Sequence, residues 1–265
     1  MNYMKCIILA GGYAKRLWPL TKYIPKPLLD INGKPIIDII LDKIMATKNI
    51  DEIIVSTNTK FEAPFREWIK EQSSDGKKMM LVIEPTLEEA CKFGTIAGIE
   101  YIINKVGVDD DLLVIAGDNL FDFELKDFIK FYKEKKAPIV AVFDVKDVCK
   151  AQLYGIVSID KNHRVIDFLE KPEEPPSTLA STACYIFPKK TLHMFSEYMK
   201  EGGRKDSPGF FIAWLSKKTP MYAYTFRGHW FDIGDFESLL KARELMKVKQ
   251  ENDIRVKAAV RGKSF

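Results

Sequence analysis

Short apolar segments alternate with longer amphipathic segments along most of the chain. The short apolar segments are typical of strands, and segments with an apolar residue every three or four positions are typical of helices. Strands are predicted at 4–10, 51–57, 79–84, 111–116, 138–145, 153–159, 164–169, 179–187 and 221–226. Helices are predicted at 36–48, 61–74, 88–104, 124–135, 188–200, 209–218 and 235–250.

The order of these elements predicts an α/β protein. Strands that alternate with helices, as in the first half, form a mainly parallel sheet with helices on both faces. From about residue 138 the strands follow one another more closely, which indicates a mixed second half. No Gly/Ser-rich linker separates the halves. We therefore expect a single domain over 1–265 with a Rossmann-like, mostly parallel central sheet.

Composition and charge narrow the range of partners. The chain has 265 residues, 46% of them hydrophobic and 12% aromatic, which is enough to bury a sizeable core. Its net charge of +4 is spread over many Lys and Glu residues and forms no block that would bind nucleic acid. There is no signal-like start and no run near the roughly 18 apolar residues of a membrane span. We expect small anionic partners, no membrane partner and a cytoplasmic location.

The four cysteines stand far apart, and three of them lie in apolar segments. They are Cys6, Cys91, Cys149 and Cys184. This spacing favours buried free thiols over disulfides or a metal site. Free thiols in turn favour a reducing compartment.

The segment 7–29, IILAGGYAKRLWPLTKYIPKPLL, has the layout of a phosphate-binding loop. A buried strand ends in Gly11 and Gly12, whose missing side chains let backbone amides approach an anion. Arg16 and Lys26 add full positive charge beyond the glycines. A Gly-Gly pair after a first strand is also common without a ligand, and the segment matches neither GxGxxG nor GxxxxGK[ST].

Carboxylates follow a second buried strand. The run VIAGDN at 114–119 ends in Asp118 and Asn119, and a carboxylate at a strand end suits Mg²⁺, which binds through one or two carboxylates. The run HWFDIGD supplies two further carboxylates, Asp232 and Asp235. An Asp after a strand is also a common turn or cap residue. We expect Asp235 to cap the helix that follows it.

Three runs together, GGYAKRLWPLT, PKPLL and GKPII at 11–37, resemble the amino-terminal signature of the nucleoside-diphosphate-sugar pyrophosphorylases. These nucleotidyltransferases join a nucleoside triphosphate to a sugar 1-phosphate, and the chain looks most like their glucose-1-phosphate thymidylyltransferases. The resemblance covers 4–245 and departs at Ala14 and Lys15, where many relatives have Gly-Thr. It implies a fold of the nucleotide-diphospho-sugar transferase type. The expected parts are a nucleotide-binding half at 1–137, a sugar-binding half at 138–235, a helical tail at 236–265 and no β-helix domain.

The same resemblance implies roles for individual residues. Implied nucleotide-binding positions are Leu9, Ala10, Gly11, Gly12, Glu84, Gly94 and Thr95. Implied sugar-phosphate positions, from LYGIVSID, FLEKP and the STA run, are Tyr154, Gly155, Glu170, Lys171 and Thr182. Implied metal ligands are Asp118 and Asp232, with Mg²⁺ as the cofactor. Taken without the family, Glu84 is equally a helix cap, and Glu170 with Lys171 is an exposed ion pair.

The implied reaction needs no protein base, because a sugar 1-phosphate is already an anion. Catalysis then consists of positioning and charge neutralisation. Arg16 is expected to neutralise the triphosphate and the leaving pyrophosphate, Lys26 the α-phosphoryl group and Lys171 the sugar phosphate. Asp118 completes the expected catalytic set through the metal.

The substrates stay open at this point. Glucose 1-phosphate with dTTP or UTP is the leading pair, and mannose 1-phosphate with GTP is the main alternative. A non-catalytic nucleotide-sugar-binding subunit is a second alternative. A glycosyltransferase would need a DxD-like metal motif, and Asp109–Asp111 precedes its strand instead of following it. Many relatives self-associate, so a homo-oligomer is one option.

Overall fold

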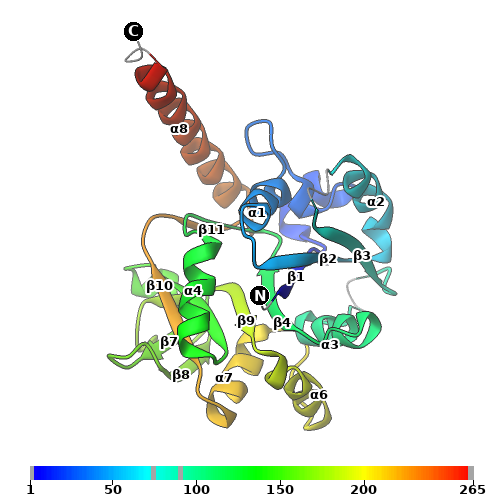
Figure 1. Cartoon of the computed structure of the whole chain (residues 1–265), viewed down its shortest axis with the longest axis vertical. Helices are drawn as coiled ribbons and strands as arrows, with labels where there is room; N and C mark the ends of the chain where they lie inside the picture. Colours follow the sequence, from blue (N-terminus) through cyan, green and yellow to red (C-terminus); the bar gives the residue numbers. More distant parts are fainter. Residues whose placement is uncertain (1–2, 73–75, 89–91, 262–265) are drawn as a thin grey trace.

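The computed structural model describes residues 3–72, 76–88 and 92–261, and these form an α/β fold. The strands are β1 (Met4–Leu9), β2 (Ile50–Asn58), β3 (Lys78–Glu84), β4 (Asp111–Ala116), β5 (Asn119–Phe121), β6 (Ile139–Asp144), β7 (Gly155–Ile159), β8 (Val165–Glu170), β9 (Leu179–Phe187), β10 (Tyr222–Phe226) and β11 (Trp230–Asp232). Nine of them form one sheet in the order β10-β6-β9-β4-β1-β2-β3, in which β7 also pairs with β9, and β8 pairs with β7 (Figure 1). Strands β1 to β4 are parallel, and β9 runs antiparallel between β4 and β6.

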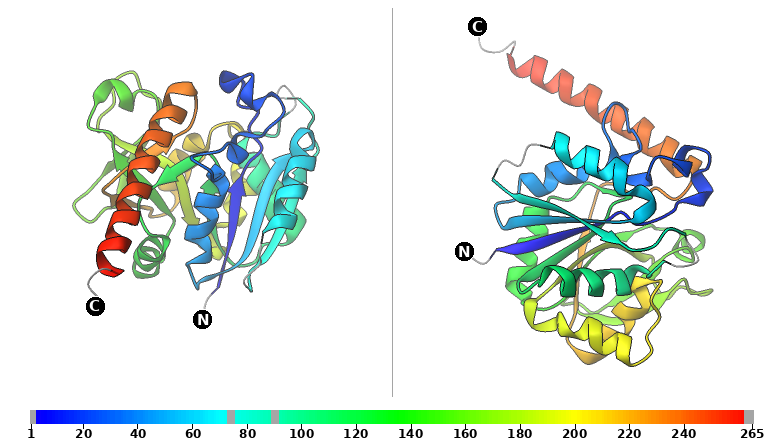
Figure 2. Two further views of the ribbon diagram at one scale, coloured as in Figure 1. Left: turned by 90° about the horizontal axis from the view of Figure 1, so that it is seen from above. Right: turned by 90° about the vertical axis from the view of Figure 1, so that its right-hand side faces the viewer.

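Helices cover both faces of this sheet, which confirms the predicted fold class. They are α1 (Ile36–Met45), α2 (Glu62–Glu71), α3 (Thr95–Val106), α4 (Leu125–Lys135), α5 (Val148–Ala151), α6 (His193–Lys200), α7 (Pro208–Lys218) and α8 (Phe236–Arg261). Helices α1, α2, α4 and the start of α8 contribute to one hydrophobic core, and α3, α6 and α7 to the other. The right-hand view of Figure 2 shows α1 and α2 on one side of the sheet and α3 and α6 on the other.

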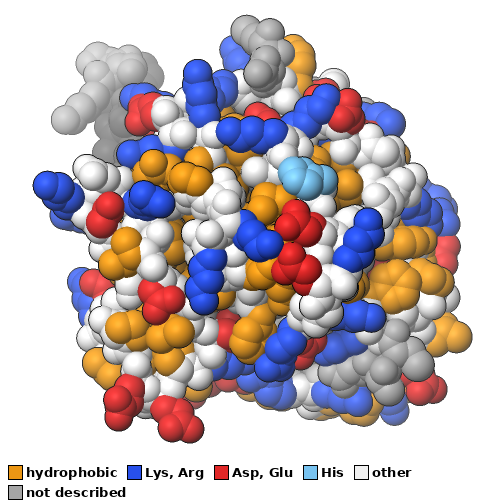
Figure 3. Space-filling model, turned by 90° about the horizontal axis from the view of Figure 1, so that it is seen from below, with side chains coloured by type: hydrophobic (Ala, Val, Ile, Leu, Met, Phe, Trp, Pro, Cys, Tyr) orange, Lys and Arg blue, Asp and Glu red, His pale blue; other side chains and the backbone are white. Residues whose placement is uncertain are grey.

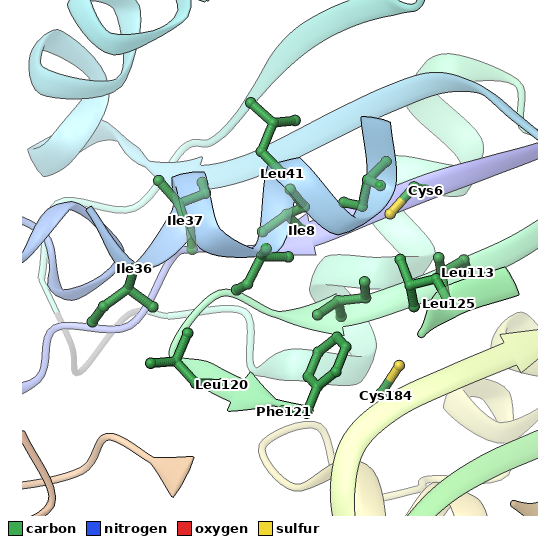
Figure 4. Close-up of a cluster of buried hydrophobic side chains, with 14 of the residues drawn as sticks. Cys6, Ile8, Ile36, Ile37, Leu41, Leu113, Leu120, Phe121, Leu125 and Cys184 are labelled. Carbon is green, nitrogen blue, oxygen red and sulfur yellow. The ribbon is translucent and has the colours of Figure 1, made fainter. Parts of the chain in front are cut away.

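Strand β1 explains why both faces are covered, since it has almost no polar residue to present to water. Cys6 and Ile8 point into one core and Ile7 into the other, as the two-residue period of a strand requires. Figure 4 shows Cys6 and Ile8 in the first core with Ile37 and Leu41 of α1. All three β1 side chains are fully buried.

The prediction of buried free thiols is confirmed for two of the three cysteines that the structure describes. Cys6 and Cys184 are buried free thiols, and Cys149 is free and exposed. Cys91 lies outside the described residues.

The structure corrects the element predictions at several places. Helix α3 begins at Thr95 and not at residue 88. Gly94 precedes it with a φ of 83°, and a Cβ there would lie 2.4 Å from the carbonyl oxygen of Lys205, so tertiary packing sets this helix start. Strands β5 and β11 have three residues each, too few to show a period in the sequence. Helix α8 continues past the predicted residue 250 to Arg261 and projects from the body of the molecule (Figure 1).

The surface is mixed in charge. On the face shown in Figure 3, Lys and Arg side chains are interspersed with Asp and Glu and with small hydrophobic areas. Within the described ranges, no helix combines the length and the apolar character that crossing a membrane requires.

Candidate active site

The first part of the site is a cavity at the carboxyl ends of parallel strands. Its volume is about 330 Å³, and it opens where β4, β1 and β3 end. In open α/β sheets this edge is where ligands bind. The lining includes Leu9, Gly11 and Gly12 after β1, Asp118 and Asn119 after β4, Glu84 at the end of β3, and Gly94 and Thr95 at α3. Six of the seven predicted nucleotide positions therefore line one cavity, and Ala10 alone lies behind it.

Side chains of β2 fix the loop that follows β1. Thr57 Oγ1 donates a hydrogen bond to the carbonyl oxygen of Ala10 at 3.3 Å, and Asn58 Nδ2 donates to that of Gly11 at 2.8 Å. Further along, Ala14 has a φ of 46°, a left-handed conformation that costs glycine less than other residues. The departure from the family at Ala14 thus leaves a glycine-like backbone in place.

Lys26 reaches the site from a short 3₁₀ turn, Lys26–Leu28, that begins after Pro25. Its ammonium forms an ion pair with Asp118 Oδ2, and these side chains are 12% and 26% exposed. Pro27 packs on Gly117, where a Cβ would lie 3.2 Å from Pro27 Cγ. The glycine of the GDN run therefore lets the lysine segment approach the end of β4.

Strands β5 and β11 form a two-stranded ribbon that brings the distant carboxylates together. Its register pairs Asn119 with Asp232, and the backbone nitrogen of Ile233 donates to the carbonyl oxygen of Asp118 at 3.1 Å. Trp230 Nε1 donates to Asn119 Oδ1 at 2.6 Å. Asp118 and Asp232, predicted from runs more than a hundred residues apart, thus line the same cavity.

The two carboxylates have opposite pKa shifts. Burial and, after it, the negative charge of Asp118 raise the pKa of Asp232 to about 6, against the opposing charges of Lys26, Arg16 and Lys171. Burial also raises the pKa of Asp118, but attraction to Lys26 outweighs it and holds that pKa below its usual value. Negative charge is therefore crowded around Asp118 and Asp232.

This pair of carboxylates fits Mg²⁺ better than Zn²⁺. Among the described residues, no group of three or more His, Cys, Asp or Glu side chains could hold a metal. Structural zinc needs four protein ligands and catalytic zinc three, whereas Mg²⁺ accepts one or two carboxylates and completes its shell with water and phosphate oxygens. A divalent cation would also stabilise the ionised form of Asp232, whose pKa is raised by burial and by the charge of Asp118.

A second cavity, of about 370 Å³, adjoins the first. Both are lined by Ala183, Tyr185, Pro208 and Asp232. The second is also lined by Arg16, Tyr154, Gly155, Glu170, Lys171 and Ser181. The predicted nucleotide and sugar-phosphate positions therefore occupy two cavities that meet at Asp232.

Glycines hold Glu170 in the second cavity. A Cβ on Gly155 would lie 2.6 Å from Phe168 Cζ and 3.0 Å from Glu170 Oε2, and one on Gly209 would lie 1.8 Å from Glu170 Oε2, so a side chain at either position would displace these groups. The backbone nitrogen of Lys171 donates to the carbonyl oxygen of Tyr154 at 3.0 Å. The YG and EKP runs, predicted separately, form one structure.

Arg16 lies against the turn after β11. A Cβ on Gly234 would come within 3.1 Å of Arg16 Nη2, which places the guanidinium on the sugar side of the junction. Asp235 caps α8 as predicted, because its Oδ1 accepts from the backbone nitrogen of Ser238 at 2.8 Å.

Glu84 faces the nucleotide side. Its Oε1 accepts a hydrogen bond from Ser56 Oγ at 2.9 Å, and a Cβ on Gly98 would lie 2.9 Å from the same oxygen. Burial raises the pKa of Glu84 above its usual value, although the bond from Ser56 lowers it in part. The N-cap of α3 is Gly94, so the structure does not bear out the helix-cap alternative for Glu84.

Thr182 is a predicted site residue that, like Ala10 and Lys26, lines neither cavity. Its side chain is fully buried, and Oγ1 donates to the carbonyl oxygen of Ala141 at 3.0 Å. Successive side chains of a strand point to opposite faces, so its neighbours Ser181 and Ala183 line the cavity instead. Ala183 has a φ of 52°, a left-handed conformation that glycine adopts at less cost than other residues.

Sequence reasoning missed several lining residues. Lys92, Asp206 and Pro208 line the first cavity, and Tyr185 lines both. The alternation from Ser181 along β9 could have indicated Tyr185. The sequence carries no comparable signal for the other three, because their positions depend on how the segment before α7 packs against Gly94.

The fold and the paired cavities define a class of nucleotide-dependent transferase, and comparison with known proteins agrees. The family model for nucleotidyl transferases matches residues 5–249. The chain belongs to this family, which agrees with the resemblance first indicated by the amino-terminal motifs.

Two curated relatives illustrate the range of the family. One is the bifunctional protein GlmU of Methanocaldococcus jannaschii, 31% identical over 255 residues, which are 96% of this chain and 57% of the relative. The other, assigned as a mannose-1-phosphate guanyltransferase of Sulfolobus acidocaldarius, is 29% identical over 231 residues, which are 87% of this chain and 60% of the relative. The chain thus spans less than two thirds of the length of each.

Solved structures show the same fold. A Bacillus anthracis protein, assigned as a glucose-1-phosphate thymidylyltransferase and solved with sucrose, has a TM-score of 0.78 and 26% identity over 91% of this chain and 94% of that one. A UDP-glucose pyrophosphorylase complexed with UDP-glucose has the same TM-score at 23% identity, over 94% of this chain and 100% of that one. The second likeness concerns the fold alone.

Proposed function

We propose that this chain is a sugar-1-phosphate nucleotidyltransferase. A phosphate oxygen of a hexose 1-phosphate forms a bond with the α-phosphorus of a nucleoside triphosphate. The bond from that phosphorus to the oxygen bridging the α- and β-phosphates breaks, and its electron pair leaves with pyrophosphate. The observation that carries the proposal is the meeting of two cavities at Asp232, with predicted nucleotide residues on one side and predicted sugar-phosphate residues on the other.

Positive charge around the junction supports this reaction. Lys26 lies at Asp118, while Arg16 and Lys171 line the second cavity. Two anionic substrates repel each other, so fixed cations between them lower the barrier by holding the reacting groups together and by stabilising developing charge. Asp118 and Asp232 would hold Mg²⁺, which when bound neutralises phosphate charge and helps to orient the substrates. The sugar phosphate is already an anion, so no protein base is required.

Two substrate pairs are candidates. Glucose 1-phosphate with dTTP or UTP is the leading pair, supported by the likeness to the B. anthracis protein assigned as a thymidylyltransferase. Mannose 1-phosphate with GTP is the second, supported by the S. acidocaldarius relative and by Glu84. An ionised carboxylate only accepts hydrogen bonds, and guanine offers two N–H donors on one edge where uracil and thymine offer one.

A purely binding role is the less favoured proposal. A regulatory subunit could lose its reactive cations, whereas Arg16, Lys26 and Lys171 all lie at the two cavities or their junction. A glycosyltransferase with a DxD motif is also less favoured. Asp109 and Asp110 precede β4, and Asp111 is its first residue, at the far end of that strand from Asp118. A cytoplasmic location belongs to the proposal and is supported by the free thiols.

The test is pyrophosphate release with Mg²⁺ across a grid of five nucleoside triphosphates and several hexose 1-phosphates. We expect strong release for one combination, which identifies both substrates, and loss of that release with a chelator. A folded protein that releases no pyrophosphate in any combination, but binds a nucleotide sugar, would contradict the proposal and support the binding role.

A further inference from the structure

Hydrogen bonds connect the turn after β2 to two parts of the nucleotide cavity, the phosphate loop and the end of β3. Asn58 caps the turn by accepting a hydrogen bond from the backbone nitrogen of Phe61 at 3.2 Å, while its Nδ2 donates to the carbonyl oxygen of Gly11. Thr59 Oγ1 donates to the carbonyl oxygen of Glu84 at 3.2 Å. Any side chain on this turn is therefore fixed relative to the phosphate loop and to β3.

Lys60 stands on that turn with its ammonium over three aromatic rings. Its Nζ lies 4.8 Å from the ring centre of Phe61, 5.6 Å from that of Tyr13 and 5.7 Å from that of Trp18. Among the described residues, no carboxylate and no hydrogen-bond acceptor is found for this ammonium. Aromatic faces attract a cation but leave its charge in place. Lys60 thus keeps a positive charge and three N–H donors.

Tyr13 and Trp18 belong to the phosphate loop, so this charge lies beside the loop. In the sheet, β1 lies between β4 and β2. Asp118 follows β4 and Lys60 follows β2, so they flank the phosphate loop on opposite sides. In the proposed reaction the α-phosphorus lies near Asp118 and Asp232, since Asp118 lines the nucleotide cavity and Asp232 lines both cavities. The distal phosphates are then free to extend toward β2.

The two cations predicted to bind the triphosphate lie toward β4 and β11. Lys26 pairs with Asp118, and Arg16 lies on the turn after β11. We propose that Lys60 binds the β- and γ-phosphates of the nucleoside triphosphate and the pyrophosphate that they become. This inference rests on the proposed function and assigns to it a binding residue that neither the family motifs nor the cavity linings indicate.

The test compares Lys60→Met and Lys60→Arg with the wild type, with Lys70→Met as the matched control. Methionine keeps an unbranched apolar side chain for the aromatic rings and removes the charge. Lys70 is exposed on α2, so its loss should change nothing. The measurements are Mg²⁺-pyrophosphate binding by calorimetry and the steady-state constants in both directions.

For Lys60→Met we expect about tenfold weaker pyrophosphate binding, in the range of a lost charge-assisted hydrogen bond. The KM for the nucleoside triphosphate should rise in parallel, and the KM for hexose 1-phosphate should stay at its wild-type value. Lys60→Arg should retain most of the pyrophosphate affinity.

Two results would overturn the role of Lys60. One is wild-type pyrophosphate binding in Lys60→Met, and the other is a uniform rise in KM for all substrates together with a lower melting temperature, which indicates a packing role. Both require an active wild type. A wild type without turnover in any substrate combination contradicts the proposed function itself, so the two failures are distinguishable.

Discussion

The two ends of the central sheet carry the same kinds of charged residue in different arrangements. At the amino ends of the strands, Glu52 is 5% exposed and forms ion pairs with Lys5 at 2.5 Å and with Lys78 at 2.6 Å. At the carboxyl ends, Asp118 has one lysine partner, and the nearby Asp232 has a pKa raised to about 6. The charge of Glu52 is thus neutralised by two lysines of the fold, whereas the negative charges of Asp118 and Asp232 lie close together with one lysine partner.

This difference separates charge that stabilises the fold from charge kept for a ligand. Burial raises the pKa of Glu52, but its hydrogen bonds to Lys5 and Lys78 outweigh burial and give a lowered pKa, so folding favours the ionised form. Folding disfavours the ionised form of Asp232, because its pKa is raised, as expected where a cation is to bind. Changes at the two ends should therefore affect different properties.

The largest expected effect is that of Asp118→Asn on turnover. Loss of this carboxylate removes a proposed metal ligand, and we expect Mg²⁺-dependent pyrophosphate release to fall about a thousandfold or more, comparable to removing a key electrostatic group. Stability should change by less than about 1 kcal/mol, because lost attraction to Lys26 is offset by relieved repulsion of Asp232. Wild-type turnover in this variant would rule out the metal role.

Lys171→Met should act on the sugar side alone. We expect kcat/KM for hexose 1-phosphate to fall about 10- to 100-fold, since a charge-assisted bond to phosphate contributes about 1.5–3 kcal/mol. Nucleotide binding, measured by calorimetry without the sugar, should be unchanged. Lys161→Met, on an exposed turn, is the control. Equal losses for both substrates would show that Lys171 does not belong to the sugar side.

Glu84→Gln should change nucleotide selection by about tenfold, because the amide replaces one acceptor by a donor. The raised pKa of Glu84 adds a pH dependence. As pH falls, wild-type Glu84 becomes protonated earlier than an ordinary glutamate and loses acceptor capacity. The KM for the nucleotide should therefore rise on acidification in the wild type more than in the variant. Identical pH profiles of KM would show that Glu84 does not contact the base.

The smallest change is expected for Glu52→Gln, which should leave turnover intact. We expect a loss of about 1–3 kcal/mol in the free energy of unfolding at neutral pH, as for a buried hydrogen bond to a charged group. The folded pKa of Glu52 is lowered, so its contribution is complete above the usual value of about 4.3 and disappears as pH falls through the folded pKa. Urea unfolding at several pH values measures this, and a constant difference down to pH 3 would contradict it.

The carboxyl end of the sheet was also the part most open to prediction from sequence. Gly11 and Asp118 come just after the apolar runs that form β1 and β4, so their place at strand ends follows from local pattern. Lys26 instead lies on a 3₁₀ turn. The meeting of Asp118 with Asp232 depends on a ribbon of three-residue strands, which has no readable period. The pairing of Asp118 with Asp232 was implied by the family resemblance alone.

Other parts could not be predicted for reasons of packing. The start of α3 at Thr95 depends on contact between Gly94 and Lys205, more than a hundred residues away. The error at Thr182 has a local cause, since neighbouring side chains of β9 point in opposite directions, one to the cavity and the next to the buried interior. The sequence pattern therefore lacks two kinds of information. It does not say which distant segments are in contact, or which face of the sheet a given strand residue points to.

The most direct test of the central claim is to measure turnover and unfolding free energy for Asp118→Asn and Glu52→Gln side by side. The account predicts opposite outcomes: Asp118→Asn loses pyrophosphate release and keeps its stability, whereas Glu52→Gln keeps release and loses stability. If both variants lose the two properties together, the charges at the two ends of the sheet do not have separate roles, and the account is contradicted.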